Sequence, residues 1–173
     1  EGVRLYSASI GKRYVWTDPA LLQSWENTLS ITRWNYLDTG ELQSQKLSVT
    51  PIRFNLVGGD NMRFSIARQS ENLRPGERKP LTRLGFDIPE GEHDFYRYTL
   101  VLRSASNRPF SAQLRSEWGG YYNGSRRGLS PEIVWRPNAH LSFELEYDVD
   151  FYEFPDMPGA SSSAITREIV FEN

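Results

Sequence analysis

Hydrophobic and polar side chains alternate without a break from His140 to Phe151. Leucine, phenylalanine, tyrosine and valine occupy every second position, and histidine, serine and acidic residues occupy the positions between them. Successive side chains of a β-strand point to opposite faces, so this period of two predicts a strand. Strands of soluble sheets are usually about 5 or 6 residues long, whereas a tilted strand needs about 9 to 11 residues to cross a bilayer. Length and pattern together favour a membrane-spanning strand with a lipid-facing and a wet face.

Similar alternation along the rest of the chain predicts nine strands and no helix longer than about two turns. We expect the strands near residues 3–16, 25–36, 42–57, 61–70, 95–105, 109–119, 128–136, 140–152 and 164–172. Pro51 lies inside the third of these stretches and predicts a bulge or a change of face, because proline cannot donate a ladder hydrogen bond.

The connections predict how these strands are joined. Tight turns are expected at 58–60, 106–108 and 137–139, and longer links at 71–94, 119–127 and 153–163, which is the asymmetry of an outer-membrane barrel. The connections are too short for crossovers, so the expected fold is one all-β domain over residues 1–173. It would be an antiparallel up-and-down meander of about nine long strands, part of a transmembrane β-barrel. Single-chain bacterial barrels have even strand numbers, so either the count is off by one or the sheet needs further strands.

The composition narrows the class of protein without deciding it. The hydrophobic fraction is 38%, the aromatic fraction 13% and the mean hydropathy -0.58. This combination suits a barrel with aromatic girdles, and it also suits a soluble β-sandwich that binds carbohydrate through aromatic rings. The net charge of -2 argues against a nucleic-acid partner, and the absence of cysteine excludes disulfides and thiolate metal sites.

Charged residues gather on the polar positions of the predicted strands, where they would face the interior of a barrel. The candidates for this lumen-facing set are Arg63, Arg97, Arg103, Arg115, Glu117, Glu132, Glu144, Glu146, Asp148 and Asp150. Pairing across strands would stabilise the wall by roughly 0.2–1 kcal/mol for each pair. The alternative is functional, a transverse field that orients solutes in a pore.

Four of these carboxylates share one face of a single strand, at positions 144, 146, 148 and 150. Their mutual repulsion calls for cations, and carboxylate oxygens are suitable ligands for calcium. The competing interpretation is a hydrated wall that pairs with neighbouring arginines, and we expect no metal or cofactor.

Four aromatic residues lie near predicted strand ends, where amphipathic rings rest at a bilayer interface. They are Trp118, Tyr121, Tyr122 and Trp135. Stacking on sugar rings is the alternative role, and both interpretations place these rings on the surface.

The sequence offers little for catalysis. It contains two histidines, His93 in a predicted loop and His140 at a predicted turn, and none of the usual nucleophile or phosphate-binding motifs. Glu144 and Glu146 lie near the separation of a retaining glycosidase pair. They would point in the same direction rather than flank a substrate, so we expect no enzymatic activity.

A resemblance extends over most of the chain and is clearest from Ser106 to Phe154. The matching residues are Trp118, Gly119, Tyr121, Gly124 and Arg126, followed by Trp135, Arg136, Pro137, Asn138, His140 and Leu141. This stretch resembles the C-terminal barrel region of DUF5916, a bacterial family of unknown function. The resemblance implies a piece of an outer-membrane barrel in a Gram-negative cell envelope. Family members usually also carry an N-terminal module similar to family 9 carbohydrate-binding modules, which is absent here.

The sequence therefore predicts an outer-membrane barrel segment that acts as an envelope scaffold or passive conduit. Its expected partners are the lipid bilayer and additional strands, either from its own polypeptide or from partner chains, because lipid cannot satisfy open strand edges. A soluble β-sandwich that binds carbohydrate is the alternative, and the burial of the apolar face distinguishes the two.

Overall fold

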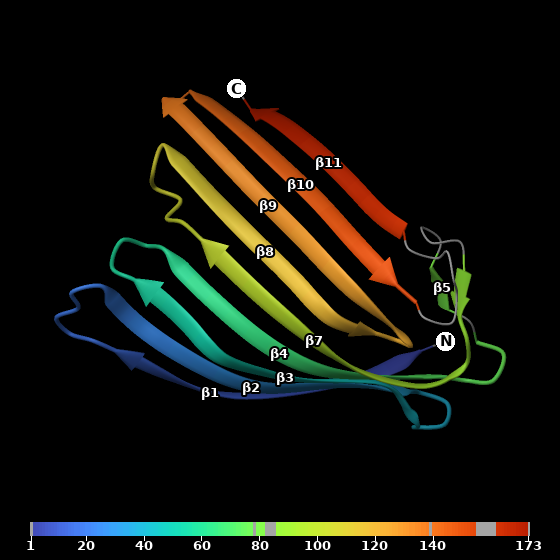
Figure 1. Cartoon of the computed structure of the whole chain (residues 1–173). Coiled ribbons are helices and arrows are strands. Elements are labelled where there is room, and N and C mark those ends of the chain that lie inside the picture. The colour runs from blue at the N-terminus through green and yellow to red at the C-terminus, as the bar shows by residue number, and fades with distance from the viewer. Residues whose placement is uncertain (1, 78, 82–85, 139, 155–161, 173) are drawn as a thin grey trace.

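Nine long antiparallel strands form one sheet in the computed structural model, which describes residues 2–77, 79–81, 86–138, 140–154 and 162–172. Every strand pairs with its neighbours in the chain apart from the short β5–β6 pair, which forms a separate hairpin (Figure 1). The strands of the main sheet, in order, are β1 (Val3–Val15), β2 (Leu22–Tyr36), β3 (Leu42–Leu56), β4 (Asn61–Leu73), β7 (Gly91–Arg103), β8 (Phe110–Tyr121), β9 (Gly124–Asn138), β10 (Leu141–Glu153) and β11 (Ser162–Glu172).

The nine-stranded antiparallel meander predicted from the alternation is confirmed, and the described residues contain no helix. A search of those residues accordingly finds no helix long and apolar enough to cross a membrane. The strands are 11 to 15 residues long, as the span from His140 to Phe151 led us to expect.

The predicted long link over 119–127 is wrong. Only Tyr122 and Asn123 separate β8 from β9, so both strands continue through the glycine-rich stretch. Gly119 has a φ of +128°, and a Cβ at this position would clash with the backbone carbonyl of Tyr96. The glycine therefore allows a close approach between β8 and β7 within the sheet.

The connections divide between two ends of the sheet. Segments 16–21, 57–60 and 104–109 lie at one end, which we call the short-turn end. Segments 37–41, 74–77, 86–90 and 122–123 lie at the other, which we call the long-link end (at the right in Figure 1). The predicted asymmetry is partly met, since the 74–90 link is long and contains β5 (Lys79–Leu81) and β6 (Phe86–Ile88), while the turn at Tyr122 is short. The 153–163 link lies largely outside the described residues.

The strand register sorts the side chains into two faces. Large hydrophobic residues occupy the apolar face, for example Phe64 opposite Leu100 and Met62 opposite Leu102, while their chain neighbours occupy the polar face. The bulge predicted at Pro51 is present between Val49 and Ile52. The extra residue shifts the alternation of β3 by one position. Val49 and Ile52 therefore both lie on the apolar face, opposite Ile66 and Phe64 of β4.

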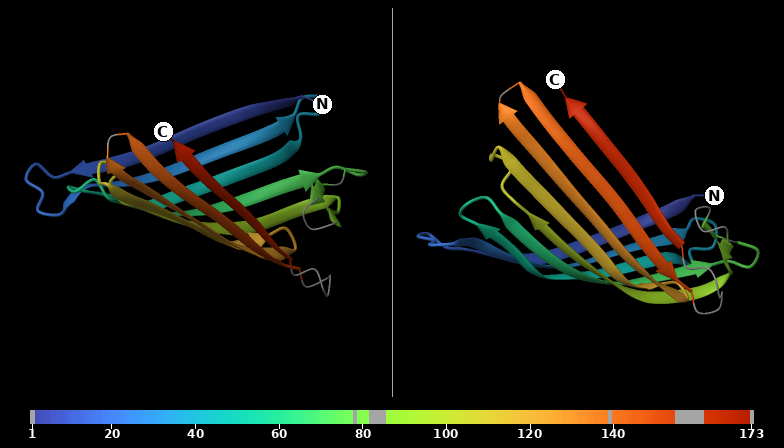
Figure 2. Two further views of the ribbon diagram at one scale, coloured as in Figure 1. Left: turned by 90° about the horizontal axis from the view of Figure 1, so that it is seen from above. Right: turned by 45° about the horizontal axis from the view of Figure 1, so that its top comes forward.

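Burial differs between the two faces. Many large side chains of the apolar face are exposed, including Leu29, Tyr96, Leu129 and Leu145. Most buried residues within the sheet lie on the polar face instead; they are Ser24, Tyr36, Ala67, Phe95, Val101, Ser111 and Val134. The sheet is curved, and β1 and β11 are its two free edges (Figure 2).

Candidate functional site

The strand register brings all ten charged candidates onto the polar face. Val101 of β7 lies between Arg63 and Arg115, and Gln113 of β8 lies between Arg103 and Glu132. Glu132 in turn lies opposite Glu146. The remaining candidates, Arg97, Glu117, Glu144, Asp148 and Asp150, follow by alternation along their strands and by their pairing in the sheet.

One sign of charge predominates on each side of this face, with Glu117 of β8 and Arg126 and Arg136 of β9 as exceptions. The basic side is formed by arginines on β3, β4, β7 and β8, namely Arg53, Arg63, Arg103 and Arg115. The acidic side is formed by β9 and β10, with Glu132, Glu144, Glu146 and Asp148. Because the strand order follows the chain order, this separation creates a field across the face, from β4 toward β10.

A network of ion pairs joins the two sides. Glu117 accepts hydrogen bonds from Arg97 at 3.0 Å and from Arg126 at 3.2 Å, and it also pairs with Arg115. Arg126 binds both carboxylate oxygens of Asp150 at 2.8 Å. The side chains of Arg97 and Glu117 are only 12% and 17% exposed. Charge-assisted bonds shielded from water are stronger than surface pairs, so the network holds β7 to β10 in register.

Sequence reasoning missed Arg126 because it fell in the stretch predicted as a loop. Its partner Asp150 was recognised only as part of the acidic strand. The rings of Tyr121 and Tyr152 lie 5.6 Å from the Arg97 guanidinium and 5.8 Å from the Arg126 guanidinium, respectively. Cation–π attraction to these rings stabilises the two guanidinium groups at the long-link side of the network.

The calcium interpretation of the acidic strand gains no support. Asp150 is engaged by Arg126, and Glu146 faces Glu132 across the strand pair. Across the described part of the chain, no group of three or more histidine and acidic side chains is arranged to hold a metal ion.

The four aromatic candidates separate into two pairs. Trp118 and Trp135 lie on the apolar face; Trp118 stacks on Tyr98 at 5.9 Å, and Trp135 is 50% exposed. Tyr121 contacts the polar-face network instead, and Tyr122 is 7% exposed, which differs from the expected surface position. Tyr122 adopts a positive φ of 54° in the β8–β9 turn, and its ring joins a buried cluster.

This cluster anchors one end of the 74–90 link. Ile88 is 1% exposed and packs with Phe95, Tyr122 and Phe154, which come from three other places in the chain. The Tyr122 hydroxyl donates a 2.7 Å hydrogen bond to Glu71. Burial of these apolar side chains fixes β6 against the long-link end of the sheet.

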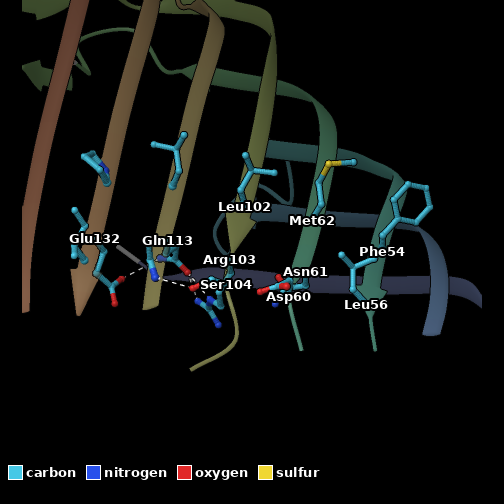
Figure 3. A pocket seen from close by; sticks show the side chains of 14 residues that line it. Phe54, Leu56, Asp60, Asn61, Met62, Leu102, Arg103, Ser104, Gln113 and Glu132 are labelled. Atoms are coloured by element: carbon cyan, nitrogen blue, oxygen red, sulfur yellow. Dashed lines mark hydrogen bonds between the residues drawn. The ribbon is translucent and has the colours of Figure 1, made fainter. Parts of the chain in front are cut away.

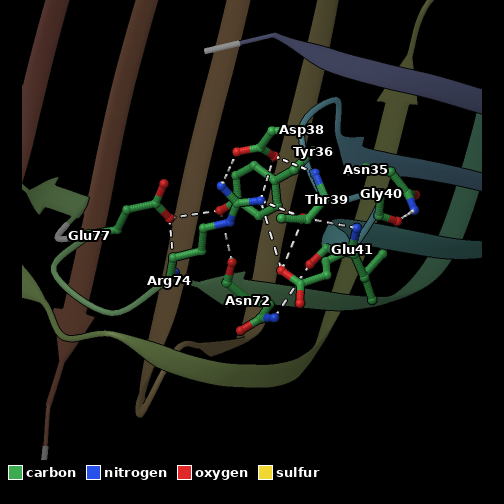
Figure 4. Close-up of polar contacts among 10 residues, drawn as sticks. Asn35, Tyr36, Asp38, Thr39, Gly40, Glu41, Asn72, Arg74 and Glu77 are labelled. Atoms are coloured by element: carbon green, nitrogen blue, oxygen red, sulfur yellow. Dashed lines mark hydrogen bonds and ion pairs between the residues drawn. The ribbon is translucent and has the colours of Figure 1, made fainter.

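Arg74 anchors the other end of the link (Figure 4). Its guanidinium donates to both carboxylate oxygens of Asp38 at 2.8 and 2.7 Å and lies 3.5 Å from the centre of the Tyr36 ring. Glu77 accepts hydrogen bonds from the Tyr36 hydroxyl at 2.7 Å and from the Arg74 backbone N–H at 2.9 Å. The link is therefore fixed to the β2–β3 turn near its start and to the β7–β9 side near its end.

The Arg74–Asp38 pair predicts a pH dependence of the link. Hydrogen bonds from Arg74 hold the pKa of the Asp38 carboxyl well below its usual value of 3.8. The ionised form therefore stabilises the link above that usual value, and the stabilisation is lost as pH falls through the lowered pKa. We expect hydrogen exchange of the Glu77 backbone amide, which donates to the Arg74 carbonyl at 2.8 Å, to accelerate in acid, after correction for intrinsic exchange. In Asp38→Asn this acid-dependent change should be much smaller, and an unchanged profile in the variant would assign it to another group.

The apolar face is hollowed toward the short-turn end (Figure 3). The hollow has a volume of about 630 Å³, and its apolar lining includes Phe54, Met62, Leu102, Leu114, Pro131 and Ile133. Arg103, Gln113 and Glu132 also line it, although the register places their side chains on the polar face, where Arg103 donates to Gln113 and Gln113 donates to Glu132 at 3.2 Å. The hollow has the size of a small-molecule site, but its continuity with the exposed apolar face makes it equally suited to hydrocarbon chains.

No known protein family, no curated protein sequence and no solved structure matches this chain. The functional argument therefore rests on the geometry of the sheet.

Proposed function

We propose that this chain is part of a bacterial outer-membrane β-barrel that serves as an envelope scaffold or passive conduit and has no catalytic role. The observation that carries the proposal is the distribution of exposed hydrophobic side chains. Nearly all those within β2 to β10 lie on one face, among them Leu29, Leu47, Leu129, Ile133 and Leu145. Exposed apolar surfaces of this extent are typical of membrane or protein–protein interaction sites, and this one suits a lipid environment.

The dimensions of the strands support the same proposal. Each long strand has at least 11 residues, and a tilted strand needs about 9 to 11 to cross a bilayer. Trp118 and Trp135 lie toward opposite ends of the apolar face, where interfacial aromatic residues are expected. A sheet that curves toward its polar face brings the side chains of that face closer together. This agrees with the burial of Ala67, Val101 and Val134 on the polar face. The resemblance to DUF5916 points to the same location.

The soluble carbohydrate-binding sandwich is the weaker candidate. A sandwich buries its apolar face beneath a second sheet. Among the described residues, the only other sheet is the small β5–β6 hairpin, and Leu145 on the apolar face is 48% exposed.

The barrel requires further strands along β1 and β11. The β1–β2 and β10–β11 pairs run without a bulge, and neither β1 nor β11 contains a proline, so no bulge or proline prevents a further strand from pairing with either edge. An antiparallel meander of nine strands directs β1 and β11 the same way. Closure by antiparallel pairing therefore calls for an odd number of additional strands, and we propose that they continue the same meander.

Tryptophan quenching tests the assignment of the faces. Trp118 lies on the apolar face and Trp34 on the polar face, where it pairs with Ser44. In full-length protein reconstituted into vesicles, the other tryptophans are replaced by phenylalanine to leave one of these two. Lipids brominated on their acyl chains should quench Trp118 strongly and Trp34 weakly, since quenching requires contact with the lipid. Equal quenching of both, or stronger quenching of Trp34, would contradict the proposed orientation.

A further inference from the structure

Arg63 is a half-buried cation on the polar face of β4. It lies directly opposite Arg53 of β3, and the neighbouring position on β7 is the uncharged Val101. Across the described residues no hydrogen bond or ion pair engages its guanidinium. Directly opposed like charges on one face destabilise a sheet, and because Glu26 pairs with Arg53, it is the charge of Arg63 that lacks a compensating anion.

Nearby arginines strengthen the positive charge at this position. Arg103 lies diagonally across the β4–β7 pair, with Asn61 as its direct partner, and repulsion from Arg53, Arg103 and Arg115 acts on Arg63. Side chains directly opposite each other have Cβ atoms about 5 Å apart and diagonal neighbours about 7 to 8 Å, within reach of long arginine side chains.

Three nearby acids, Glu26, Glu117 and Asp60, are engaged by other arginines. Glu26 is shared between Arg13 at 3.0 Å and Arg53 at 3.5 Å. Glu117 is shared among three arginines of the central network, and Asp60 pairs with Arg108 at 2.8 Å. Arg103 donates to the neutral Gln113, which leaves its charge uncompensated.

We propose that Arg53, Arg63 and Arg103 form a binding site for an anionic solute that presents a carboxylate, sulfate or phosphate group. Guanidinium groups offer planar pairs of N–H donors that match the oxygens of such anions. The site lies on the polar face, opposite the acidic side formed by β9 and β10, so a bound anion would be held at the basic wall. This inference depends on the polar-face geometry alone and does not require the proposed membrane location.

Sulfate binding tests the site in the full-length protein in detergent. Isothermal titration with sodium sulfate, at an ionic strength fixed with sodium chloride, should detect binding to the native protein. Arg63→Gln should weaken the affinity roughly tenfold or more, the effect of losing one charge-assisted hydrogen bond. The matched control is Arg68→Gln, because Arg68 is also on β4 but pairs with Asp94 at 3.3 Å. This variant should bind sulfate like the native protein.

The stability of the variants without sulfate separates binding from a structural role. Arg63→Gln removes an uncompensated charge, so its midpoint of thermal unfolding in sulfate-free buffer should equal or exceed that of the native protein. Absence of sulfate binding to the native protein would overturn the proposal, as would equal binding by Arg63→Gln or an equal loss in Arg68→Gln. A lowered unfolding midpoint for Arg63→Gln would also overturn it, because Arg63 would then be satisfied within the fold. None of these results bears on the quenching of Trp118 by lipid.

Discussion

Replacing Leu100 by arginine is expected to destabilise the protein in lipid vesicles by about 2–4 kcal/mol, the cost of arginine near the middle of a bilayer. Leu100 lies on the apolar face between Phe64 of β4 and Ser116 of β8. The aromatic residues Phe110 and Trp118 lie toward the two ends of β8, so this position is within the apolar belt. Urea unfolding in vesicles, followed by tryptophan fluorescence, measures the change.

The adjacent residue provides a matched control. Thr99 lies on the polar face directly opposite Glu117, so an arginine there does not enter the lipid. Thr99→Arg should change the free energy of unfolding by less than about 1 kcal/mol, as expected for a polar, partly solvated position. Equal destabilisation by the two variants would show that the faces are assigned incorrectly.

The alternation of the sequence was sufficient to predict the sheet. Nine strands, their antiparallel order and the bulge at Pro51 follow from periodicity and turn residues alone. The polar-face position of the charged candidates follows as well, because a strand period of two fixes the face once one residue is placed. The separation of charge was also accessible, since neighbours in this sheet are neighbours in the chain.

The long-link end could not be predicted in the same way. Residues 119–127 are predicted to form a link because glycines usually interrupt strands, whereas Gly119 here permits close contact with β7. Tyr122 is predicted to lie on the surface as an interfacial or sugar-stacking ring, although it packs with Ile88 and Phe154. That cluster joins residues far apart in the chain, and local periodicity carries no information about such contacts.

The anchoring of the 74–90 link has the same origin. Arg74 and Asp38 belong to different connections, and neither interrupts a hydrophobic pattern in a recognisable way. The meander order places the end of β4 near the end of β2, with β3 between them. An ion pair of this kind can be predicted once the strand order is known, but the hydrophobic pattern of the sequence does not indicate it.

Replacing Glu117 by glutamine is expected to destabilise the protein by about 2–3 kcal/mol, just below the usual cost of breaking a buried ion pair. The substitution keeps the shape of the side chain but removes the negative charge shared by Arg97, Arg115 and Arg126. Arg126 retains Asp150, whereas Arg97, only 12% exposed, loses its acidic partner. Urea unfolding of the reconstituted protein measures the loss.

Glu132→Gln is the matched control for this prediction. Glu132 lies on the same face, but its described contact is a single 3.2 Å hydrogen bond from the neutral side chain of Gln113, and it faces the like charge of Glu146. Its replacement should change the free energy of unfolding by less than about 0.5 kcal/mol, because relief of repulsion offsets the weakened hydrogen bond. If the two variants were equally stable, Glu117 would not be the centre of the network. If the protein forms the proposed barrel and conducts ions, Glu117→Gln should also shift its selectivity toward anions, because the basic side of the polar face is then less compensated. The reversal potential across a planar bilayer measures this shift.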